Sequence, residues 1–293
     1  MIKGHIKKLI LKVATTLPID VKHSLETAYK KEKLQNAKKV LEDIQSNIAL
    51  AEKNKIPLCQ DTGVPTFYVK VPKHFSHKTI IQDIIDATRE ATKEIPLRPN
   101  AVDSLEGTNT GDNIGFNDKR TEVQQPIIYI DQWDKNYITI DLMLKGGGSE
   151  NIGALYKLPD KNLKADRNIE GVKKCVIDAV FQAQGKGCPP YVIGVAIGGS
   201  KDMAAKESKK QLLRNIYDTN RDKKLAKLEN ELREKINSLG IGPLGLGGKT
   251  TVLAVKIKAL HRHPASFFVD ISFMCWACRR GKLIYRNGDA IFS

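Results

Sequence analysis

This sequence lacks several features that mark secreted and membrane-spanning proteins. Its 293 residues include five cysteines, and an odd, widely spread set argues against the disulfide framework of a small secreted protein. No apolar run approaches the roughly 20 residues that a membrane-spanning helix needs. Residues 1–17 carry a short apolar run without a small-residue cleavage site, so they do not predict a signal peptide. We therefore expect a cytoplasmic protein with reduced thiols and no membrane partner.

The chain has an excess of basic residues but lacks the usual pattern of a nucleic-acid-binding protein. Lysine and arginine number 48 against 33 acidic residues, which gives a net charge of +15. The lysines are scattered along predicted helices, with no arginine-rich arm and no interleaved aromatic residues. We therefore expect no nucleic-acid partner and a field that draws in small anions. Nucleic-acid binding is the alternative, and it predicts salt-dependent retention on DNA.

The glycine-rich run at residues 240–251 does not have the spacing of a nucleotide-binding loop. A phosphate-binding loop needs a glycine five positions before Gly248, where the chain has Pro243. The dinucleotide-binding pattern would need a glycine at Thr250. We therefore exclude both kinds of nucleotide site from this run.

The hydrophobic pattern predicts helices alternating with strands. Residues 2–54 place apolar side chains at helical spacing, and Pro18 interrupts the pattern. Further helices are expected at 79–92, 169–184 and 221–239, and strands at 66–71, 126–130, 137–144, 191–197, 252–257 and 266–274. We expect an α/β (mixed) fold in two lobes, with a helical N-terminal segment and a lobe boundary that the pattern does not set.

One stretch, residues 56–70, combines chemically active side chains with a turn and a strand. Cys59, Gln60 and Asp61 place a soft ligand, an amide and a carboxylate side by side, just before the turn at Gly63. A thiol beside ionisable groups at the mouth of a strand is a plausible place for metal chemistry. The alternative is that Cys59 is a small buried apolar residue.

Two further loops are suited to binding a carboxylate. Arg98 lies in the proline-flanked segment Pro96–Pro99. Such a segment would hold the guanidinium in a fixed direction, suited to bidentate recognition of a carboxylate. An exposed loop arginine is the alternative. Gly146, Gly147 and Gly148 follow a predicted strand and would present backbone N–H groups to an anion, although a flexible hairpin loop would also use glycines there.

Three of the cysteines share one setting in the predicted fold. Cys59, Cys188 and Cys275 each lie at an end of a predicted apolar strand. Thiolates at such places can converge on an iron–sulfur cluster, and three ligands for a four-iron cluster leave one iron open as a Lewis acid. Cys175 lies within a predicted helix and is expected to be structural. Cys278 could replace Cys275 as a ligand, and the Cys-x-x-Cys pair that they form also suggests redox or zinc chemistry.

The motifs of the chain resemble one known family. These motifs are CQDTG at 59–63, KGGGSEN at 145–151, CPPY at 188–191 and RHPAS at 262–266, with Cys275 following. Together they resemble the alpha-type half of the class I, iron–sulfur-dependent fumarases and L-tartrate dehydratases. The likeness runs in the family's order over nearly the whole chain, and it implies a single iron–sulfur hydro-lyase domain over residues 1–293.

The resemblance implies a [4Fe-4S] cluster with one open iron, held by Cys59, Cys188 and Cys275. The chain departs from the family's pattern at Pro264, where some relatives have glycine, and at Cys278, which lies outside the shared pattern. Lys249 matches a lysine of the family's GGK run, and its role is left open.

The resemblance also implies roles around the substrate. Asp61 and His263 are assigned to catalysis, and Gln60 is expected beside the substrate. Arg98 matches an arginine that holds a substrate carboxylate, and the glycines at 146–148 match the backbone cradle. The general base is expected from a partner chain.

From these implications we expect the cluster-carrying alpha subunit of a hydro-lyase that reversibly hydrates fumarate to (S)-malate. Single-chain family members continue into a further domain, so a separate beta-type subunit is expected, together with a small dicarboxylate substrate and alpha–alpha contacts within a hetero-oligomer. The alternative in the same class is the alpha subunit of an L(+)-tartrate dehydratase, which forms oxaloacetate. The alternative from another class is a redox or iron–sulfur carrier protein that uses Cys275 and Cys278.

Overall fold

The structure is a computed structural model that describes residues 2–95, 97–116 and 122–293. It confirms the mixed α/β class with a helical N-terminal segment. The chain divides into two compact units. The first comprises Met1–Pro18, Asn47–Gly147 and Arg279–Ser293, and the second comprises Ile19–Ser46 and Gly148–Cys278. The assignment of residues 1–293 to one catalytic domain stays a prediction.

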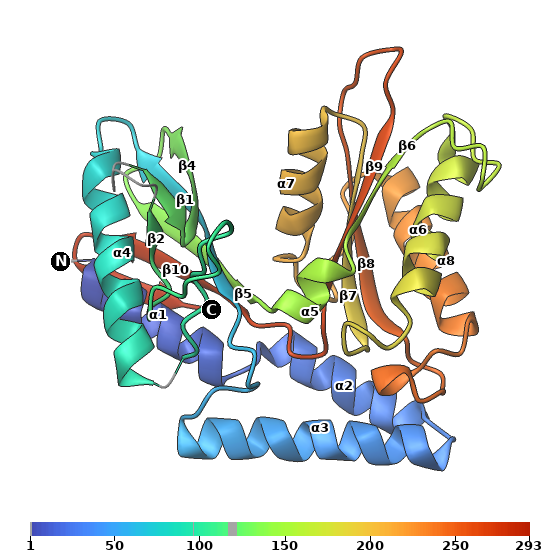
Figure 1. Cartoon of the computed structure of the whole chain (residues 1–293), viewed down its shortest axis with the longest axis horizontal. Coiled ribbons are helices and arrows are strands. Elements are labelled where there is room, and N and C mark those ends of the chain that lie inside the picture. The colour runs from blue at the N-terminus through green and yellow to red at the C-terminus, as the bar shows by residue number, and fades with distance from the viewer. Residues whose placement is uncertain (1, 96, 117–121) are drawn as a thin grey trace. The chain divides into compact units, whose positions relative to one another are not determined.

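The first unit contains a five-stranded sheet in the order β11-β10-β5-β1-β4 (Figure 1). Strand β1 pairs parallel with β4, whereas the other neighbours are antiparallel. A separate pair, β2–β3, lies in the same unit. The elements are α1 (Lys3–Thr15), β1 (Val64–Pro72), α4 (His77–Glu94), β2 (Gly115–Phe116), β3 (Val123–Gln125), β4 (Ile127–Trp133), β5 (Ile138–Lys145), β10 (Arg280–Arg286) and β11 (Asp289–Phe292).

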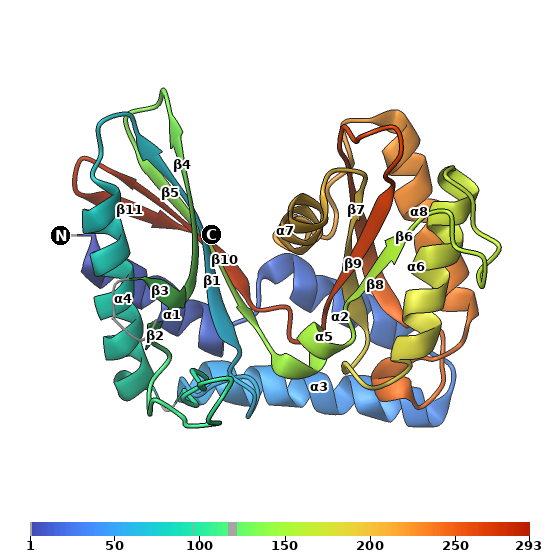
Figure 2. The same cartoon turned by 45° about the horizontal axis from the view of Figure 1, so that its top comes forward.

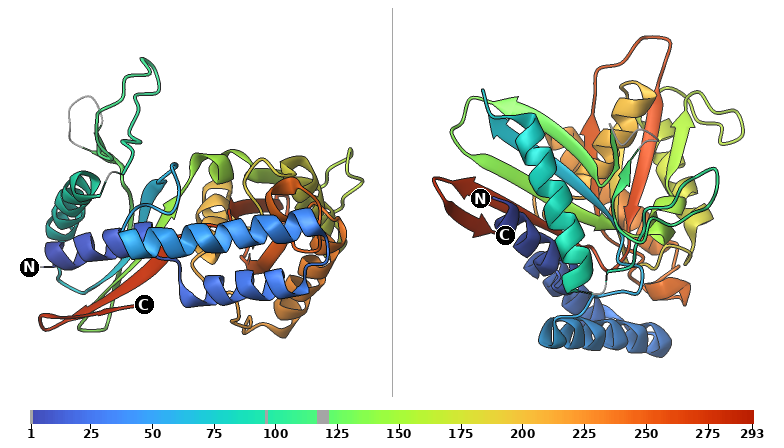
Figure 3. Two further views of the ribbon diagram at one scale, coloured as in Figure 1. Left: turned by 90° about the horizontal axis from the view of Figure 1, so that it is seen from below. Right: turned by 60° about the vertical axis from the view of Figure 1, so that its left-hand side comes forward.

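Helices α1 and α4 supply the apolar core of the first unit. Their side chains recur at helical spacing, so Ile6 and Ile10 of α1 and Ile80 and Ile84 of α4 are fully buried in one cluster with Phe67 of β1. Figure 3 shows the β10–β11 hairpin beside α1. The core therefore holds the C-terminal hairpin and the strand that follows Asp61 in one compact unit.

The second unit contains a four-stranded sheet in the order β6-β9-β7-β8. Helices α6 and α8 cover one face of this sheet and α7 covers the other (Figure 2). The elements are α2 (Ile19–Lys31), β6 (Ala154–Lys157), α6 (Ile169–Ala183), β7 (Tyr191–Ile197), α7 (Lys201–Gln211), α8 (Lys223–Ser238), η1 (Pro243–Gly245), β8 (Val252–Ala259) and β9 (Phe268–Met274). Two helices, α3 (Gln35–Asn54) and α5 (Gly147–Asn151), contain a boundary between the units.

The register of the second sheet decides which loops meet. Strand β7 is parallel to β8 and antiparallel to β9, with Val192 opposite Met274 and Ile197 opposite Val269. The residues before β7 and those after β9 therefore lie at one end of the sheet. The β7–α7 turn and the β8–β9 loop lie at the other end. No helix in the described ranges is long and apolar enough to cross a bilayer.

Candidate functional site

In the first unit, the loop that carries Cys59 starts from a fixed point. The N–H of Leu58 donates to the carbonyl of Ala14 at 3.0 Å, and the side-chain amide of Asn47 donates to the carbonyl of Leu58 at 2.9 Å. Leu58 is buried, whereas Cys59 is half-buried and Gln60 is exposed. The thiol and the amide therefore project from a rigid base toward solvent.

Asp61 is bound by backbone groups on both of its carboxylate oxygens. Its Oδ1 accepts the N–H of Gly63 at 3.1 Å, and its Oδ2 accepts the N–H of Gly147 at 2.7 Å. Backbone N–H groups at a glycine-rich turn suit an anion. In this structure, the anion that Gly147 binds is the chain's own carboxylate, so Asp61 positions the loop in addition to any contact with substrate.

Glycine allows close packing at two positions around this carboxylate. Gly63 has a φ of +82°, and a Cβ there would lie 2.7 Å from the carbonyl carbon of Leu144. A Cβ on Gly146 would lie 2.7 Å from Oδ2 of Asp61. Gly148 belongs to the second unit and is exposed. A Cβ on Gly148 would lie 3.7 Å from the carbonyl oxygen of Lys186.

Arg98 is held through its backbone, and its side chain is exposed. Its N–H donates to Oγ1 of Thr62 at 3.1 Å, and its carbonyl accepts from Nδ2 of Asn113 at 3.1 Å. Asn100 ties the same loop to Thr62 at 3.3 Å. The guanidinium makes no hydrogen bond or ion pair to any residue that the structure describes. Pro96, which was expected to stiffen this loop, lies outside the described residues.

Replacing Thr62 with valine is expected to lower the free energy of unfolding by about 1–3 kcal/mol. The change keeps the shape of this buried side chain but leaves the N–H of Arg98 without its acceptor. Urea denaturation of the unaltered and Thr62→Val chains measures the difference. The control, Thr79→Val, alters an exposed hydroxyl and should change stability by less than about 0.5 kcal/mol. Equal stability of the two variants would contradict the role given to Thr62.

In the second unit, Cys188 has an unusual backbone conformation. Its φ is +60°, in the left-handed region that side-chain-bearing residues rarely adopt, and the residue is exposed. Its N–H donates to the carbonyl of Gly185 at 3.1 Å, and its carbonyl accepts the N–H of Trp276 at 3.1 Å. Strain of this kind persists where the surroundings impose it, and it is frequent at functional sites.

Cys275 lies at the same end of the sheet as Cys188. Cys275 follows β9 directly, and the hydrogen bond from Trp276 to Cys188 ties the two segments together. Burial raises the pKa of the Tyr191 hydroxyl to about 12, and the nearby thiols of Cys188 and Cys275 add to the rise. Cys188 and Cys275 therefore both lie near the start of β7.

The other two cysteines have a different setting. Cys175 and Cys278 are both fully buried, whereas Cys275 is half-buried. Burial raises the pKa of the Cys175 thiol to about 12, which disfavours the thiolate that binds metal. Among the five thiols, none of which forms a disulfide, Cys59, Cys188 and Cys275 are the accessible ones.

His263 lies at the opposite end of the second sheet from the two thiols. It is exposed in the β8–β9 loop, with its Nδ1 accepting the N–H of Ala265 at 3.1 Å. Strand β9 separates His263 from Cys275, and its seven residues span about 23 Å at 3.3 Å each. The second unit therefore does not bring His263 together with Cys188 and Cys275, and its catalytic assignment stays a prediction.

A buried arginine beside Asp61 was not predicted from the sequence. Arg279 is 1% exposed, and its Nη1 donates to the carbonyl of Asp61 at 2.6 Å. Its Nε has no hydrogen-bond partner in the described part of the chain. The signal available in the sequence was the Arg279-Arg280 pair directly after Cys278.

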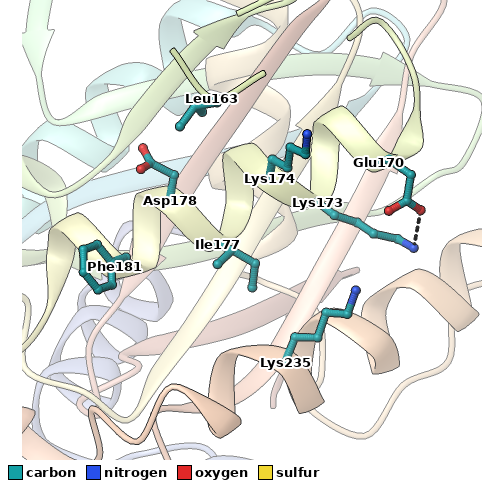
Figure 4. Close-up of a pocket in the computed structure, with 8 residues that line it drawn as sticks. All are labelled: Leu163, Glu170, Lys173, Lys174, Ile177, Asp178, Phe181 and Lys235. Carbon is teal, nitrogen blue, oxygen red and sulfur yellow. Dashed lines mark hydrogen bonds and ion pairs between the residues drawn. The ribbon is translucent and has the colours of Figure 1, made fainter. Parts of the chain in front are cut away.

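The described residues contain no group of three or more His, Cys, Asp or Glu side chains that could hold a metal ion by itself. Cys188 and Cys275 do not form such a group by themselves, and Cys59 belongs to the other unit. A groove of about 460 Å³ lies elsewhere, between α6 and α8, where Lys173 pairs with Glu170 at 2.7 Å (Figure 4). None of the predicted site residues lines this groove.

Comparison with known proteins gives a consistent assignment. The model of the fumarate hydratase (Fumerase) family matches residues 3–284. A Geobacillus stearothermophilus protein assigned as a class I fumarate hydratase is 43% identical over 277 residues, which cover 93% of this chain and 52% of that protein. The chain thus spans about half the length of this relative.

Two relatives that bear a subunit name match over most of their own length. A Methanocaldococcus jannaschii protein assigned as an L(+)-tartrate dehydratase subunit alpha is 44% identical over 276 residues, or 93% of each chain. The L(+)-tartrate dehydratase subunit alpha of Escherichia coli K12 is 36% identical over 273 residues, or 93% of this chain and 86% of that one. As the motifs predicted, the chain belongs to the fumarate hydratase (Fumerase) family of hydro-lyases.

Proposed function

We propose that this chain is the alpha subunit of a hydro-lyase that interconverts fumarate and (S)-malate, with a [4Fe-4S] cluster held by Cys59, Cys188 and Cys275. The observation that carries the proposal is the setting of Cys188. An exposed thiol is held in a left-handed conformation by backbone hydrogen bonds and faces the same end of the sheet as Cys275.

The donor set fits such a cluster. Three accessible thiols without disulfides suit iron, while the fully buried Cys175 and Cys278 do not compete. The setting of Cys278 thus favours Cys275 as the third ligand. When bound, a cluster with an open iron supplies a Lewis acid that polarises a hydroxyl or a carboxylate.

The chain's own side chains would bind and orient the dicarboxylate. The exposed guanidinium of Arg98, on a loop fixed by Thr62, suits a bidentate grip on one carboxylate. Gln60 projects beside Cys59 as a hydrogen-bonding amide, and Gly148 offers a backbone at the start of α5. Asp61 holds this loop against Gly147. The net charge of +15 attracts the dianion.

The proposal includes a separate beta-type subunit that supplies the base. Its support is the pattern of matches: the chain matches most of two relatives named as alpha subunits, but about half of the longer Geobacillus relative. The same pattern suggests a hetero-oligomer with alpha–alpha contacts. Thiols that must stay reduced to bind iron suit the cytoplasm.

Tartrate is the second candidate substrate, because two of the relatives carry the name L(+)-tartrate dehydratase. Anaerobic co-expression with a beta-type chain, followed by parallel assays on malate, fumarate and L(+)-tartrate, distinguishes the two. Preferred turnover of fumarate and malate supports the first proposal, and preferred release of oxaloacetate from tartrate supports the second. If the cluster-containing pair of subunits turns over none of the three substrates, both proposals are contradicted.

Air is expected to inactivate the assembled enzyme. An iron that lacks a protein ligand is exposed to small oxidants and is the first to be lost. Activity is measured before and after aeration, and again after anaerobic addition of ferrous iron with a reductant, which should restore it. Activity that survives prolonged aeration unchanged would argue against an open iron.

A further inference from the structure

The glycine-rich run that failed the nucleotide-binding patterns packs directly behind Cys188. We call residues 242–248 the glycine loop. The N–H of Leu244 in this loop donates to the carbonyl of Pro189 at 2.8 Å. A Cβ on Gly245 would lie 2.7 Å from the Cα of Gly185, so the two backbones touch where neither residue has a side chain.

Gly185 links this contact to the thiol. Its carbonyl accepts the N–H of Cys188 at 3.1 Å, while Gly245 lies against its Cα. On the other side, the N–H of Trp276 binds the carbonyl of Cys188 at 3.1 Å. The left-handed conformation of Cys188 is therefore held between the glycine loop and the segment that carries Cys275.

A buried carboxylate anchors the far end of the glycine loop. Glu32 is 4% exposed, and its Oε2 accepts the N–H of Lys249 at 2.7 Å. A Cβ on Gly248 would lie 2.8 Å from the same oxygen, so glycine lets the backbone come close to the carboxylate. The opposite oxygen accepts the N–H groups of Lys33 and Leu34 at 2.9 and 3.0 Å.

We propose that the glycine loop, anchored by Glu32, is the positioning element of the Cys188 thiol. By pressing on Gly185 it imposes the backbone conformation that presents this thiol beside Cys275. This gives a role to the GGK run, in which Lys249 contributes its backbone N–H to the anchor. The inference rests on the proposed function for the identity of Cys188 as a cluster ligand.

Two alanine substitutions distinguish the effect of a steric clash with Gly185 from the effect of an unfavourable backbone conformation. Gly245 and Gly240 both have left-handed backbones, with φ of +77° and +69°. A Cβ on Gly240 would meet nothing within 4 Å, whereas a Cβ on Gly245 would strike Gly185. Gly240→Ala is therefore the matched control for Gly245→Ala, because both carry a similar conformational cost.

The first measurement is hydrogen exchange of backbone amides in the full chain without its cluster. In Gly245→Ala, the amides of Cys188 and Trp276 are expected to exchange about 5- to 30-fold faster, because their hydrogen bonds open more often. The amide of Gly198, which donates to Phe268 at 2.8 Å at the other end of the sheet, should not change. A general destabilisation of the second unit would accelerate exchange of the Gly198 amide as well.

The second measurement is the iron content after anaerobic reconstitution. It should fall in Gly245→Ala and stay at the unaltered level in Gly240→Ala. If the Cys188 amide exchanges faster in Gly245→Ala but the unaltered chain takes up no iron, the proposed function is refuted and the positioning role is still supported. Unchanged exchange of both amides in Gly245→Ala would overturn the inference, whatever the iron content.

If Gly245→Ala does not fold, Glu32→Gln tests the same inference without adding an atom to the contact. It weakens the acceptor for the N–H of Lys249, so exchange of the Cys188 amide should again accelerate. No change in that amide would overturn the inference.

Discussion

Without the proposed beta-type partner, the chain with a rebuilt cluster is expected to hydrate fumarate at less than about one hundredth of the rate of the pair. Loss of one general acid–base group typically costs a factor of about 10²–10⁴, and missing carboxylate contacts add to the loss through poorer positioning. Asp61 is engaged by the N–H groups of Gly63 and Gly147. His263 lies at the end of β9 away from Cys275. We therefore expect the base to come from the proposed beta-type partner.

Initial rates of anaerobic fumarate hydration, for the reconstituted chain alone and for the pair, provide the measurement. Within the pair, Arg98→Lys should lower the rate, because an ammonium cannot reproduce the planar fork of a guanidinium. Arg221→Lys, which alters another exposed arginine, should leave the rate unchanged. Full turnover by the chain alone would contradict the two-subunit proposal and place the base on this chain.

Replacing Cys188 with serine is expected to abolish the iron–sulfur cluster. A hydroxyl is a poor substitute for a thiolate as a ligand of iron in such a cluster, and the same loss is expected for Cys59→Ser and Cys275→Ser. Visible absorbance, with iron and sulfide per chain after anaerobic reconstitution, gives the measurement. In all three variants, the absorbance and the iron and sulfide contents should be close to those of a chain without a cluster.

The buried thiols provide matched controls. Cys175→Ser and Cys278→Ser should keep the full complement of iron, because both side chains are fully buried and are not among the proposed ligands. Circular dichroism and thermal unfolding check that each variant is folded, since a hydroxyl in the core is itself destabilising. Retention of the cluster in Cys275→Ser together with its loss in Cys278→Ser would show that the third ligand was assigned to the wrong cysteine.

Local patterns in the sequence predicted much of the secondary structure. Strand β7 was expected at 191–197, and the structure has it at Tyr191–Ile197, because a fully buried strand is a continuous apolar run bounded by turn residues. Helices α4, α6 and α8 follow equally from apolar residues at helical spacing. Strands β6, β10 and β11 were missed. They are short or partly exposed, and apolar and polar residues do not alternate along their sequences.

The arrangement of the site depends on long-range pairing that no local pattern reveals. Cys188 and Cys275 meet because β7 and β9 pair antiparallel in one register, and the same pairing places His263 at the far end. The glycines after β5 were interpreted as a backbone cradle for an anion, and their assignment to substrate binding stays a prediction. The sequence could not show that Asp61 itself occupies the N–H of Gly147. The cluster assignment stays a prediction, resting on the setting of the three thiols and on the family.

We propose a four-iron cluster with three cysteine ligands and one iron open to substrate. Mössbauer spectroscopy of the chain reconstituted with ⁵⁷Fe and paired with its beta-type subunit, before and after addition of malate or tartrate, tests it most directly. One iron in four is expected to have parameters distinct from the others, and only the parameters of that iron should change when substrate binds. Four irons that all keep unchanged parameters in the presence of substrate would contradict it.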